Sequence, residues 1–507
     1  MRKDPMHLAR NWFQSNGWKP FPFQESSWQK VLDANDGLLN APTGSGKTYS
    51  LLLPLLERIR NDERKGLKII WVSPIRALTK EILQASQKAI FGLGLSLTVE
   101  IRTGDTSSKE KARQKSQMPD ILITTPESLH ILFAQKQHTK HFRILQAVVV
   151  DEWHELLGSK RGVLMELALA RFRTLRPELI TWGISATIGN LQEAMEVLLS
   201  PTRAKKGLII RADLEKKIEV VSVLPDSIEK IPWAGHLGIR LLPELLPLIE
   251  LSQTSLIFTN TRSQAEIWYQ RLLEANPDLS GRMAMHHGSI SRELRFWVEE
   301  ALFHGNIKAV VCTSSLDLGV DFRPVDRIFQ IGSPKGVARF LQRAGRSGHQ
   351  PGAVSRIHFI PTHALELVEA AALREAIAEE VVEERHPHVR SFDVLLQYMT
   401  TLAVSDGFYS DELYKEISSC FCFDSVSHEE WQSCLNFLTT GGSLSAYDDY
   451  HKVVVDEDGR HYVDSRRIAR RHRFSIGTIV SDTMIRVKLK RGGVLGHVEE
   501  YFISRLK

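Results

Sequence analysis

The segment Ala41-Pro42-Thr43-Gly44-Ser45-Gly46-Lys47-Thr48 has the residue types and spacing of a phosphate-binding loop. It fits the pattern G-x-x-x-x-G-K-[ST], with Ala41 at the position of the first glycine. Backbone N–H groups of such a loop can point at a phosphate, the lysine can reach the β and γ phosphates, and the hydroxyl can hold Mg²⁺. The predicted nucleotide-binding residues are Thr43, Gly44, Ser45, Gly46, Lys47 and Thr48, with Thr48 also a metal ligand.

Two carboxylates follow an apolar run in Val148-Val149-Val150-Asp151-Glu152-Trp153-His154. In α/β folds, ligands sit at the carboxyl ends of the strands. Asp151 is suited to hold Mg²⁺, and Glu152 is suited to orient and deprotonate an attacking water. An acidic loop without function is the alternative, and the phosphate-binding loop upstream makes the catalytic interpretation the stronger one.

A second basic motif, Gln342-Arg343-Ala344-Gly345-Arg346-Ser347-Gly348-His349, lies far along the chain. Arg343 and Arg346 are three residues apart, so on a helical turn they would face the same way. Two guanidinium groups aimed at a phosphate suit transition-state stabilisation in phosphoryl transfer. We predict catalytic roles for Gln342, Arg343 and Arg346, with a surface basic patch as the alternative.

These motifs need strands to end at them and helices to follow, and the hydrophobic pattern provides both. Gly37–Asn40 reads as the strand before the loop, and a helix opens at Tyr49. Continuous apolar runs predict two tandem, doubly wound α/β domains with parallel sheets. The first domain is predicted at residues 1–215, with strands at 68–72, 121–124, 147–150 and 181–184. The second is predicted at 216–386, with strands at 255–258, 283–286, 309–312, 327–331 and 356–360 and a long helix at 365–384.

The pattern changes after Pro387, where three short helices (391–404, 410–418 and 427–439) precede a hairpin at 452–463. This order predicts a winged-helix domain at 387–473, with a small helical spacer as the alternative. Its end, Asp464 to Arg473, contains five arginines, and we predict that Arg470 and Arg471 contact nucleic-acid phosphates. Residues 474–507 alternate apolar and polar side chains, which indicates a partial β-barrel-like module in a truncated fragment.

Composition limits the protein class. The chain has 507 residues and a net charge of +5, which permits nucleic-acid binding. No apolar run is long enough for a transmembrane helix, and the first residues lack a secretory signal pattern. The four cysteines favour buried thiols in a reducing cytoplasm. Zinc bound by Cys420, Cys422, Cys434 and His428 is a weaker alternative.

The order of these motifs resembles that of superfamily 2 helicases of the DExH-box kind. Gln24, ahead of the loop, is similar to the glutamine that reads adenine in this group. Residues 73–78, 104–106, 124–128, 185–187, 257–262, 287–289 and 313–321 resemble the group's further motifs. The resemblance implies ATP and Mg²⁺ as cofactors, with Gly319 and Asp321 at the nucleotide. It also implies nucleic-acid contacts by Arg76, Thr125, Thr259 and Thr313.

Trp12-Phe13, residues 17–21 and 233–238, and residues 476–479 and 496–500 are similar to Lhr-type helicases, most of all the bacterial ligase-associated ones. This resemblance implies two RecA-like domains, a winged helix and a β-barrel-like module. It also implies ATP-driven 3′-to-5′ movement on single-stranded DNA, unwinding of DNA duplexes or RNA:DNA hybrids, and a role in repair. The implied partners are single-stranded DNA or a tailed duplex, and a DNA ligase and nuclease of the same pathway, with the chain acting as a monomer. An RNA helicase or ribonucleoprotein remodeller, a scaffold with an inactive ATP site and the motor subunit of a nuclease are the alternatives.

Overall fold

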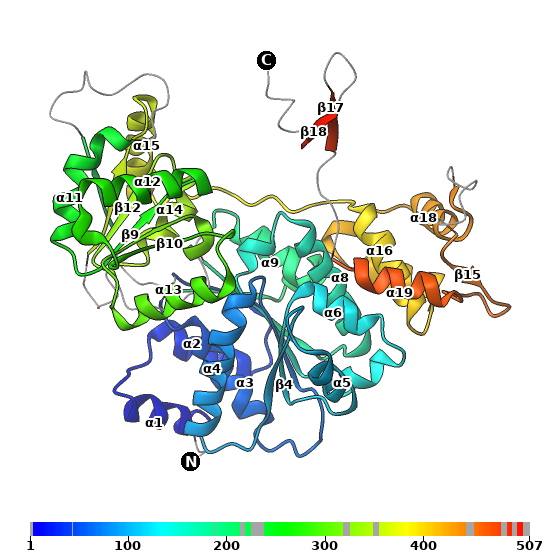
Figure 1. The fold of residues 1–507 in the computed structure, drawn as a ribbon. Helices are drawn as coiled ribbons and strands as arrows, with labels where there is room; N and C mark the ends of the chain where they lie inside the picture. The colour runs from blue at the N-terminus through cyan, green and yellow to red at the C-terminus, as the bar shows by residue number, and fades with distance from the viewer. Residues whose placement is uncertain are drawn as a thin grey trace. The chain divides into compact units, whose positions relative to one another are not determined.

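The computed structural model describes residues 4–42, 44–186, 188–212, 218–224, 238–317, 325–347, 354–442, 451–477, 484–488 and 494–499 (Figure 1). By its internal contacts the chain divides into two compact units. The first unit comprises Met1–Thr125, Arg143–Glu155 and Arg176–His386, and it holds two parallel sheets. The second comprises Pro126–Phe142, Leu156–Leu175 and Pro387–Lys507.

The first sheet of the first unit has seven parallel strands in the order β3-β4-β2-β5-β6-β1-β7. Its strands are β1 (Gly37–Asn40), β2 (Ile69–Val72), β3 (Val99–Arg102), β4 (Ile121–Thr124), β5 (Ala147–Val150), β6 (Ile180–Ser185) and β7 (Leu208–Arg211). The five strands expected from apolar runs are present. The pattern did not reveal β3 and β7, because β3 carries charged residues and β7 is a half-buried edge strand.

Two helices of this first α/β domain precede β1, and the others lie between or after its strands. The helices are α1 (His7–Ser15), α2 (Pro22–Leu32), α3 (Lys47–Ile59), α4 (Arg76–Gly92), α5 (Ser108–Ser116), α7 (Trp153–Leu156), α9 (Leu191–Leu199) and α10 (Pro201–Ala204). The apolar face of α3 joins a core that includes Trp28, Trp71 and Trp182. Burial of this face fixes α3, and with it the loop that precedes it, against the sheet.

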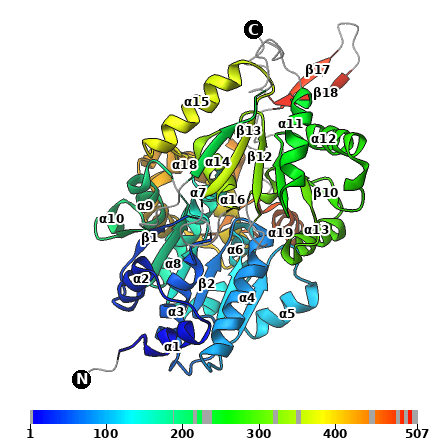
Figure 2. The ribbon, with the colours of Figure 1, turned by 90° about the vertical axis from the view of Figure 1, so that its left-hand side faces the viewer.

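The second sheet has six parallel strands in the order β10-β11-β9-β12-β13-β8 (Figure 2). Its strands are β8 (Ile218–Ser222), β9 (Ser255–Phe258), β10 (Met283–His286), β11 (Ala309–Cys312), β12 (Arg327–Ile331) and β13 (Ser355–Ile360). Its helices are η3 (Ile239–Leu241), α11 (Leu242–Glu250), α12 (Arg262–Ala275), η4 (Pro277–Leu279), α13 (Arg292–His304), η5 (Ser314–Leu316), α14 (Val337–Ala344) and α15 (Leu365–Ala378). The two RecA-like domains inferred from the sequence are confirmed.

The prediction of a long helix at 365–384 was wrong at its C-terminal end. Helix α15 stops at Ala378, and Glu380 adopts a positive φ of 56°. Residues 379–384, directly after Ala378, are two glutamates, two valines and two more glutamates. Such a run of β-branched and like-charged side chains supports a helix poorly. Residues 381–386 therefore continue as an irregular segment.

The second unit contains the winged helix. Its elements are α6 (Pro126–Phe133), η1 (His138–Phe142), α8 (Lys160–Leu175), α16 (Phe392–Val404), β14 (Phe408–Tyr409), α17 (Ser410–Ile417), η6 (Phe421–Phe423), α18 (His428–Thr440), β15 (Val454–Val455), β16 (Arg460–Tyr462) and α19 (Arg466–Ser475). The three predicted helices and the hairpin are confirmed, including the capping box of Ser427 and Glu430. Strand β14 adds a third member to the small antiparallel sheet.

Helices from two distant parts of the chain form the core of the second unit. Helix α16 packs on α6 and α8, and α17 packs on α8. Arg171 on α8 pairs with Glu416 on α17 at 3.0 Å, and the hydroxyl of Tyr398 also donates to Glu416. The winged helix and the two earlier helices thus share one buried interior.

Two further strands, β17 (Met484–Lys488) and β18 (Val494–Glu499), pair in antiparallel fashion. No helix within the described ranges is long and apolar enough to span a bilayer. Within those same ranges no group of three or more His, Cys, Asp or Glu residues could hold a metal, and Cys312, Cys420, Cys422 and Cys434 are all buried. The domain limits 1–215, 216–386, 387–473 and 474–507 remain our proposal.

Candidate active site

The phosphate-binding loop turns between β1 and α3 through two left-handed glycines. Gly44 has φ 80° and Gly46 has φ 77°, conformations that other L-residues rarely adopt. Ser45 is buried, and its hydroxyl donates to the carbonyl of Pro42 at 2.7 Å. The first turn of α3 therefore begins at Lys47, with its N–H groups directed at the loop.

Gln24 closes one side of this loop. Its side-chain amide donates to the carbonyl of Gly46 at 3.1 Å, and its oxygen accepts from the backbone N–H of Phe21 at 2.9 Å. A Cβ placed on Gly46 would lie 2.8 Å from the Gln24 amide nitrogen. Only glycine at position 46 allows this contact, which links the predicted adenine-reading residue to the loop.

Lys47 lies among the acidic residues of the motif after β5. Its ammonium is 3.6 Å from the carboxylate of Glu152, and both side chains are buried. The ammonium has no hydrogen-bond partner among the residues that the structure describes. A buried ammonium in this position costs free energy unless an anion completes its shell, as a phosphate would.

The pKa values of the two carboxylates are shifted in opposite directions. Burial, and then the charge of Glu152, raises the pKa of Asp151 to about 6. Burial alone would raise the pKa of Glu152, but the positive charges of Lys47 and Arg346 outweigh it and lower that pKa. Asp151 accepts hydrogen bonds from the indole N–H of Trp71 at 3.3 Å and from the N–H of Glu152 at 2.9 Å.

The backbone at Glu152 is strained. Its φ is 44°, in the left-handed region that a glutamate rarely occupies. Such strain costs on the order of 1–3 kcal/mol and persists where the surrounding structure imposes it. One carboxylate oxygen of Glu152 has no hydrogen-bond partner within the described part of the chain, so it can accept a proton or a water.

His154 joins this motif to both α/β domains. Its Nδ1 accepts the backbone N–H of Ala186 at 3.1 Å, and its Nε2 lies 2.8 Å from the side-chain amide of Gln342. Burial lowers the pKa of His154 despite the nearby Glu152 and Glu155, so the ring is neutral. Because Nδ1 accepts, Nε2 carries the proton, and it faces the side-chain amide nitrogen of Gln342.

Arg343 and Arg346 make different contacts in the structure. The guanidinium of Arg343 makes two hydrogen bonds to Asp317, at 2.7 and 3.1 Å, and a further one to Gln330. Arg343 also lies over the ring of Phe258 and is almost fully buried. Arg346 follows the end of α14 and donates to the backbone carbonyl of Asp317 at 2.8 Å. Of the two arginines, Arg346 is the one whose charge acts on Glu152.

The predicted nucleic-acid residues of the first unit differ in accessibility. Arg76 is exposed and pairs with Asp105 at 3.0 Å, whereas Thr125 is buried. Thr313 is half-buried at the end of β11. Thr259 is buried, and its hydroxyl donates to the backbone carbonyls of Thr261 and Cys312, both at 3.2 Å.

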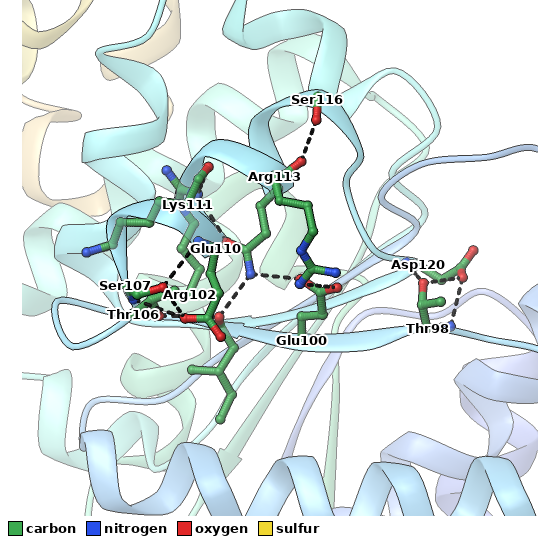
Figure 3. Close-up of polar contacts among 12 residues, drawn as sticks. Thr98, Glu100, Arg102, Thr106, Ser107, Glu110, Lys111, Arg113, Ser116 and Asp120 are labelled. Atoms are coloured by element: carbon green, nitrogen blue, oxygen red, sulfur yellow. Dashed lines mark hydrogen bonds and ion pairs between the residues drawn. The ribbon is translucent and has the colours of Figure 1, made fainter.

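A cavity of about 1160 Å³ lies beside Arg76 and Asp105, with Phe296 and Phe303 of α13 on its other side. Figure 3 shows the polar contacts between β3 and α5, both of which contribute residues to its lining. Buried Arg102 donates to Gln114 at 3.1 Å, and Gln114 donates to Glu100 at 2.9 Å. These contacts tie β3 to α5, and Thr103 and Thr106 of the segment between them line the cavity.

Arg470 and Arg471, in the second unit, are exposed on α19. The guanidinium of Arg470 lies over the ring of Phe474 at 5.9 Å. The expectation that the arginine-rich segment is helical is confirmed. Thr43, Thr187, Gly319 and Asp321, together with residues 233–237, 348–349, 478–479 and 500 of the predicted motifs, lie outside the described residues.

Three residues that the sequence did not single out belong to this region. Asp317 orients both arginines. Asn190, in the loop after β6, binds the backbone of Arg385, and Glu383 caps the start of α14. Position within a recognised motif could have pointed to Asp317. No pattern in the sequence points to Glu383, which lies in a run of acidic residues.

The residues present fit Mg²⁺ and a nucleoside triphosphate. The Thr48 hydroxyl and the Asp151 carboxylate are hard oxygen donors of the kind that Mg²⁺ prefers. The ammonium of Lys47, which has no hydrogen-bond partner in the part of the chain that the structure describes, and the left-handed loop glycines suit a phosphate. Lys47 and Thr48 come from the loop and the start of α3, and Asp151 comes from the motif after β5.

Three protein-family descriptions match the chain. They are "DEAD/DEAH box helicase" over residues 21–194, "Helicase conserved C-terminal domain" over 238–350 and "Large helicase-related protein, winged helix domain" over 375–507. The ATP-dependent helicase Lhr-Core of Sulfolobus acidocaldarius is 31% identical over 98% of this chain and 58% of its own length. The Lhr helicase/uracil glycosylase of Escherichia coli is 29% identical over 87% of this chain and 33% of its own length.

Among solved structures, Mycobacterium smegmatis helicase Lhr bound to ssDNA and AMP-PNP superposes with a TM-score of 0.82 and 28% identity. The match covers 96% of this chain and 64% of that one. The chain therefore spans less than two thirds of the length of these relatives.

Proposed function

We propose that this chain, which belongs to the Lhr-type helicases of superfamily 2, is an ATP-dependent motor that moves along single-stranded DNA. The observation that carries the proposal is the contact between His154 and Gln342, at 2.8 Å. It connects the acidic motif of the first α/β domain with the arginine-bearing helix of the second. Hydrolysis then depends on how these two domains meet.

In the proposed mechanism, Lys47 binds the β and γ phosphates of ATP, and Glu152 takes the proton of the attacking water. Thr48 and Asp151 would hold Mg²⁺, which neutralises charge on the phosphates. Arg346 stabilises the charge that develops on the transferred phosphoryl group. Loss of the γ phosphate removes contacts shared by the two domains and lets them separate.

Nucleic acid is the proposed second ligand. Arg76 and the cavity beside it, together with Thr125 and Thr313, would hold strand phosphates on the first unit. The exposed arginines of α19 would contribute further phosphate contacts. Movement in the 3′-to-5′ direction, unwinding of DNA duplexes or RNA:DNA hybrids, and a repair role with a ligase and nuclease extend this proposal. A cytoplasmic monomer is the proposed form.

The test is an unwinding assay with 3′-tailed and 5′-tailed duplexes, in which the tracking strand is DNA or RNA. We expect ATP-dependent unwinding of 3′-tailed duplexes with a DNA tracking strand. The Lys47→Ala variant should unwind none of the duplexes. Equal activity on an RNA tracking strand would favour the RNA-helicase alternative. Absence of any nucleic-acid-stimulated ATP hydrolysis would overturn the proposal.

A further inference from the structure

The irregular segment Val381–His386, which we name the strap, follows α15 where the sequence predicted more helix (yellow in Figure 1). It belongs to the first unit and contacts both α/β domains there. One of its contacts is with the start of α14, and the other is with the loop after β6. These two places adjoin Gln342 and Ala186, the two partners of His154.

Glu383 caps the helix that bears the arginines. Its carboxylate accepts the backbone N–H of Val337 at 3.0 Å and that of Ala338 at 3.0 and 3.2 Å. The N-terminal residue Gly336 has φ 144°, and a Cβ there would lie 2.3 Å from the Glu383 carboxylate. A carboxylate at this helix end satisfies two otherwise unpaired N–H groups and complements the helix dipole.

The strap is also fastened to the first α/β domain. The backbone N–H of Arg385 donates to the side-chain oxygen of Asn190 at 2.9 Å, and the Asn190 amide donates back to the carbonyl of Arg385 at 3.0 Å. The N–H of Gly189 donates to the carbonyl of Glu383 at 3.2 Å. A Cβ on Gly189 would lie 2.5 Å from the carbonyl oxygen of Val382.

We propose that the strap positions the arginine-bearing helix of the ATP site relative to the loop after β6. Glu383 caps the N-terminus of α14, and Asn190 and Gly189 of the loop after β6 bind the backbone of the strap at Arg385 and Glu383. Glu383 touches neither Lys47 nor Glu152, so it is a positioning residue that acts through Gln342 and Arg346. The inference rests on the proposed ATP hydrolysis.

The test begins with Glu383→Ala and Glu383→Gln, with Glu384→Gln as the matched control. Glu384 is the adjacent, exposed carboxylate and caps none of the helices that the structure describes. We expect Glu383→Ala to lower kcat for DNA-stimulated ATP hydrolysis about tenfold, the effect of losing a helix cap and its charge. Glu383→Gln should lower it less. ATP affinity, DNA affinity without ATP and the thermal midpoint should stay near those of the parent, as should every property of Glu384→Gln.

A steric variant tests the other attachment without removing a side-chain hydrogen bond. Gly189→Ala would displace the strap because the new Cβ meets backbone, and we expect a fall in kcat similar to that of Glu383→Ala. A double-mutant cycle with Arg346→Ala gives the decisive readout. If Glu383 acts through Arg346, Glu383→Ala costs less than twofold in the Arg346→Ala background.

Two results would overturn the inference. One is full kcat in both Glu383→Ala and Gly189→Ala while the parent hydrolyses ATP. The other is an additive cycle, in which Glu383→Ala costs tenfold with or without Arg346. A parent protein with no DNA-stimulated hydrolysis would instead overturn the proposed function, so the two failures are distinguishable.

Discussion

At the scale of single residues, Glu152 combines three properties that suit a general base. It lies in a strained left-handed conformation, it has an unpartnered carboxylate oxygen within the described part of the chain, and its pKa is lowered by neighbouring cations. A lowered pKa keeps the group ionised at neutral pH, ready to accept a proton. None of these properties can be read from the residue types in the motif.

The first prediction concerns Glu152→Gln. Glutamine keeps the shape of the side chain but cannot accept the proton, so we expect at least a hundredfold loss of ATP turnover. Binding of a non-hydrolysable ATP analogue should change less than threefold. Steady-state hydrolysis and analogue binding measure the two effects. Turnover within a few-fold of the parent would exclude Glu152 as the base.

The second prediction separates the two arginines. Arg346→Ala should cut ATP hydrolysis strongly and leave DNA binding without ATP intact, because Arg346 is the arginine whose charge acts on Glu152. Arg343→Ala would leave Asp317 buried without its bidentate partner, which costs about 3–5 kcal/mol of folding free energy. Thermal unfolding of both variants provides the comparison. A lower midpoint for Arg346→Ala than for Arg343→Ala would contradict this assignment.

At the scale of elements, the packing of α8 on the 3-10 helix η6 buries a carboxylic acid. Burial raises the pKa of Glu166 to about 8, although the N–H of Cys422 donates to it at 2.9 Å. The folded protein therefore keeps Glu166 protonated where the unfolded chain ionises it. This difference removes folding free energy progressively as pH rises from about 5 to about 8.

The third prediction follows from that linkage. Glu166→Gln reproduces the protonated shape and cannot ionise, so it should raise the thermal midpoint at pH 8 by about 5 °C and change it little at pH 5. Thermal unfolding from pH 5 to pH 8 measures the difference between variant and parent. A difference that does not grow with pH would show that Glu166 is ionised in the folded protein.

The fourth prediction belongs to helix α19. Replacing Arg470 and Arg471 together by alanine should weaken single-stranded DNA binding and lower the slope of log affinity against log salt by roughly 1–2, one for each lost phosphate contact. Lys415→Ala, which removes an exposed cation on α17, is the control and should leave the slope unchanged. An unchanged slope in the double variant would show that α19 is only a solvated face.

At the scale of the whole molecule, much of the architecture could be predicted because parallel strands buried on both faces appear as continuous apolar runs. Strands such as Ala147–Val150 and Ala309–Cys312 are fully buried and were found in this way. Strands β3, β7 and β8 carry charged or half-exposed residues, and the pattern did not mark them. The membership of α6 and α8 in the winged-helix unit was also beyond the sequence, since it depends on long-range packing.

The sequence alone determined the chemistry: a loop for phosphates, two carboxylates after a strand, and arginines far downstream, each recognised from local spacing. Only the tertiary structure decided which contacts each of these groups makes. It buries Arg343 against Asp317, brings Gln342 to His154, and replaces the end of a predicted helix with a strap that caps α14. The physical reason is that local spacing fixes which residues share a turn. Charge pairing and burial between distant segments fix which of them face the site.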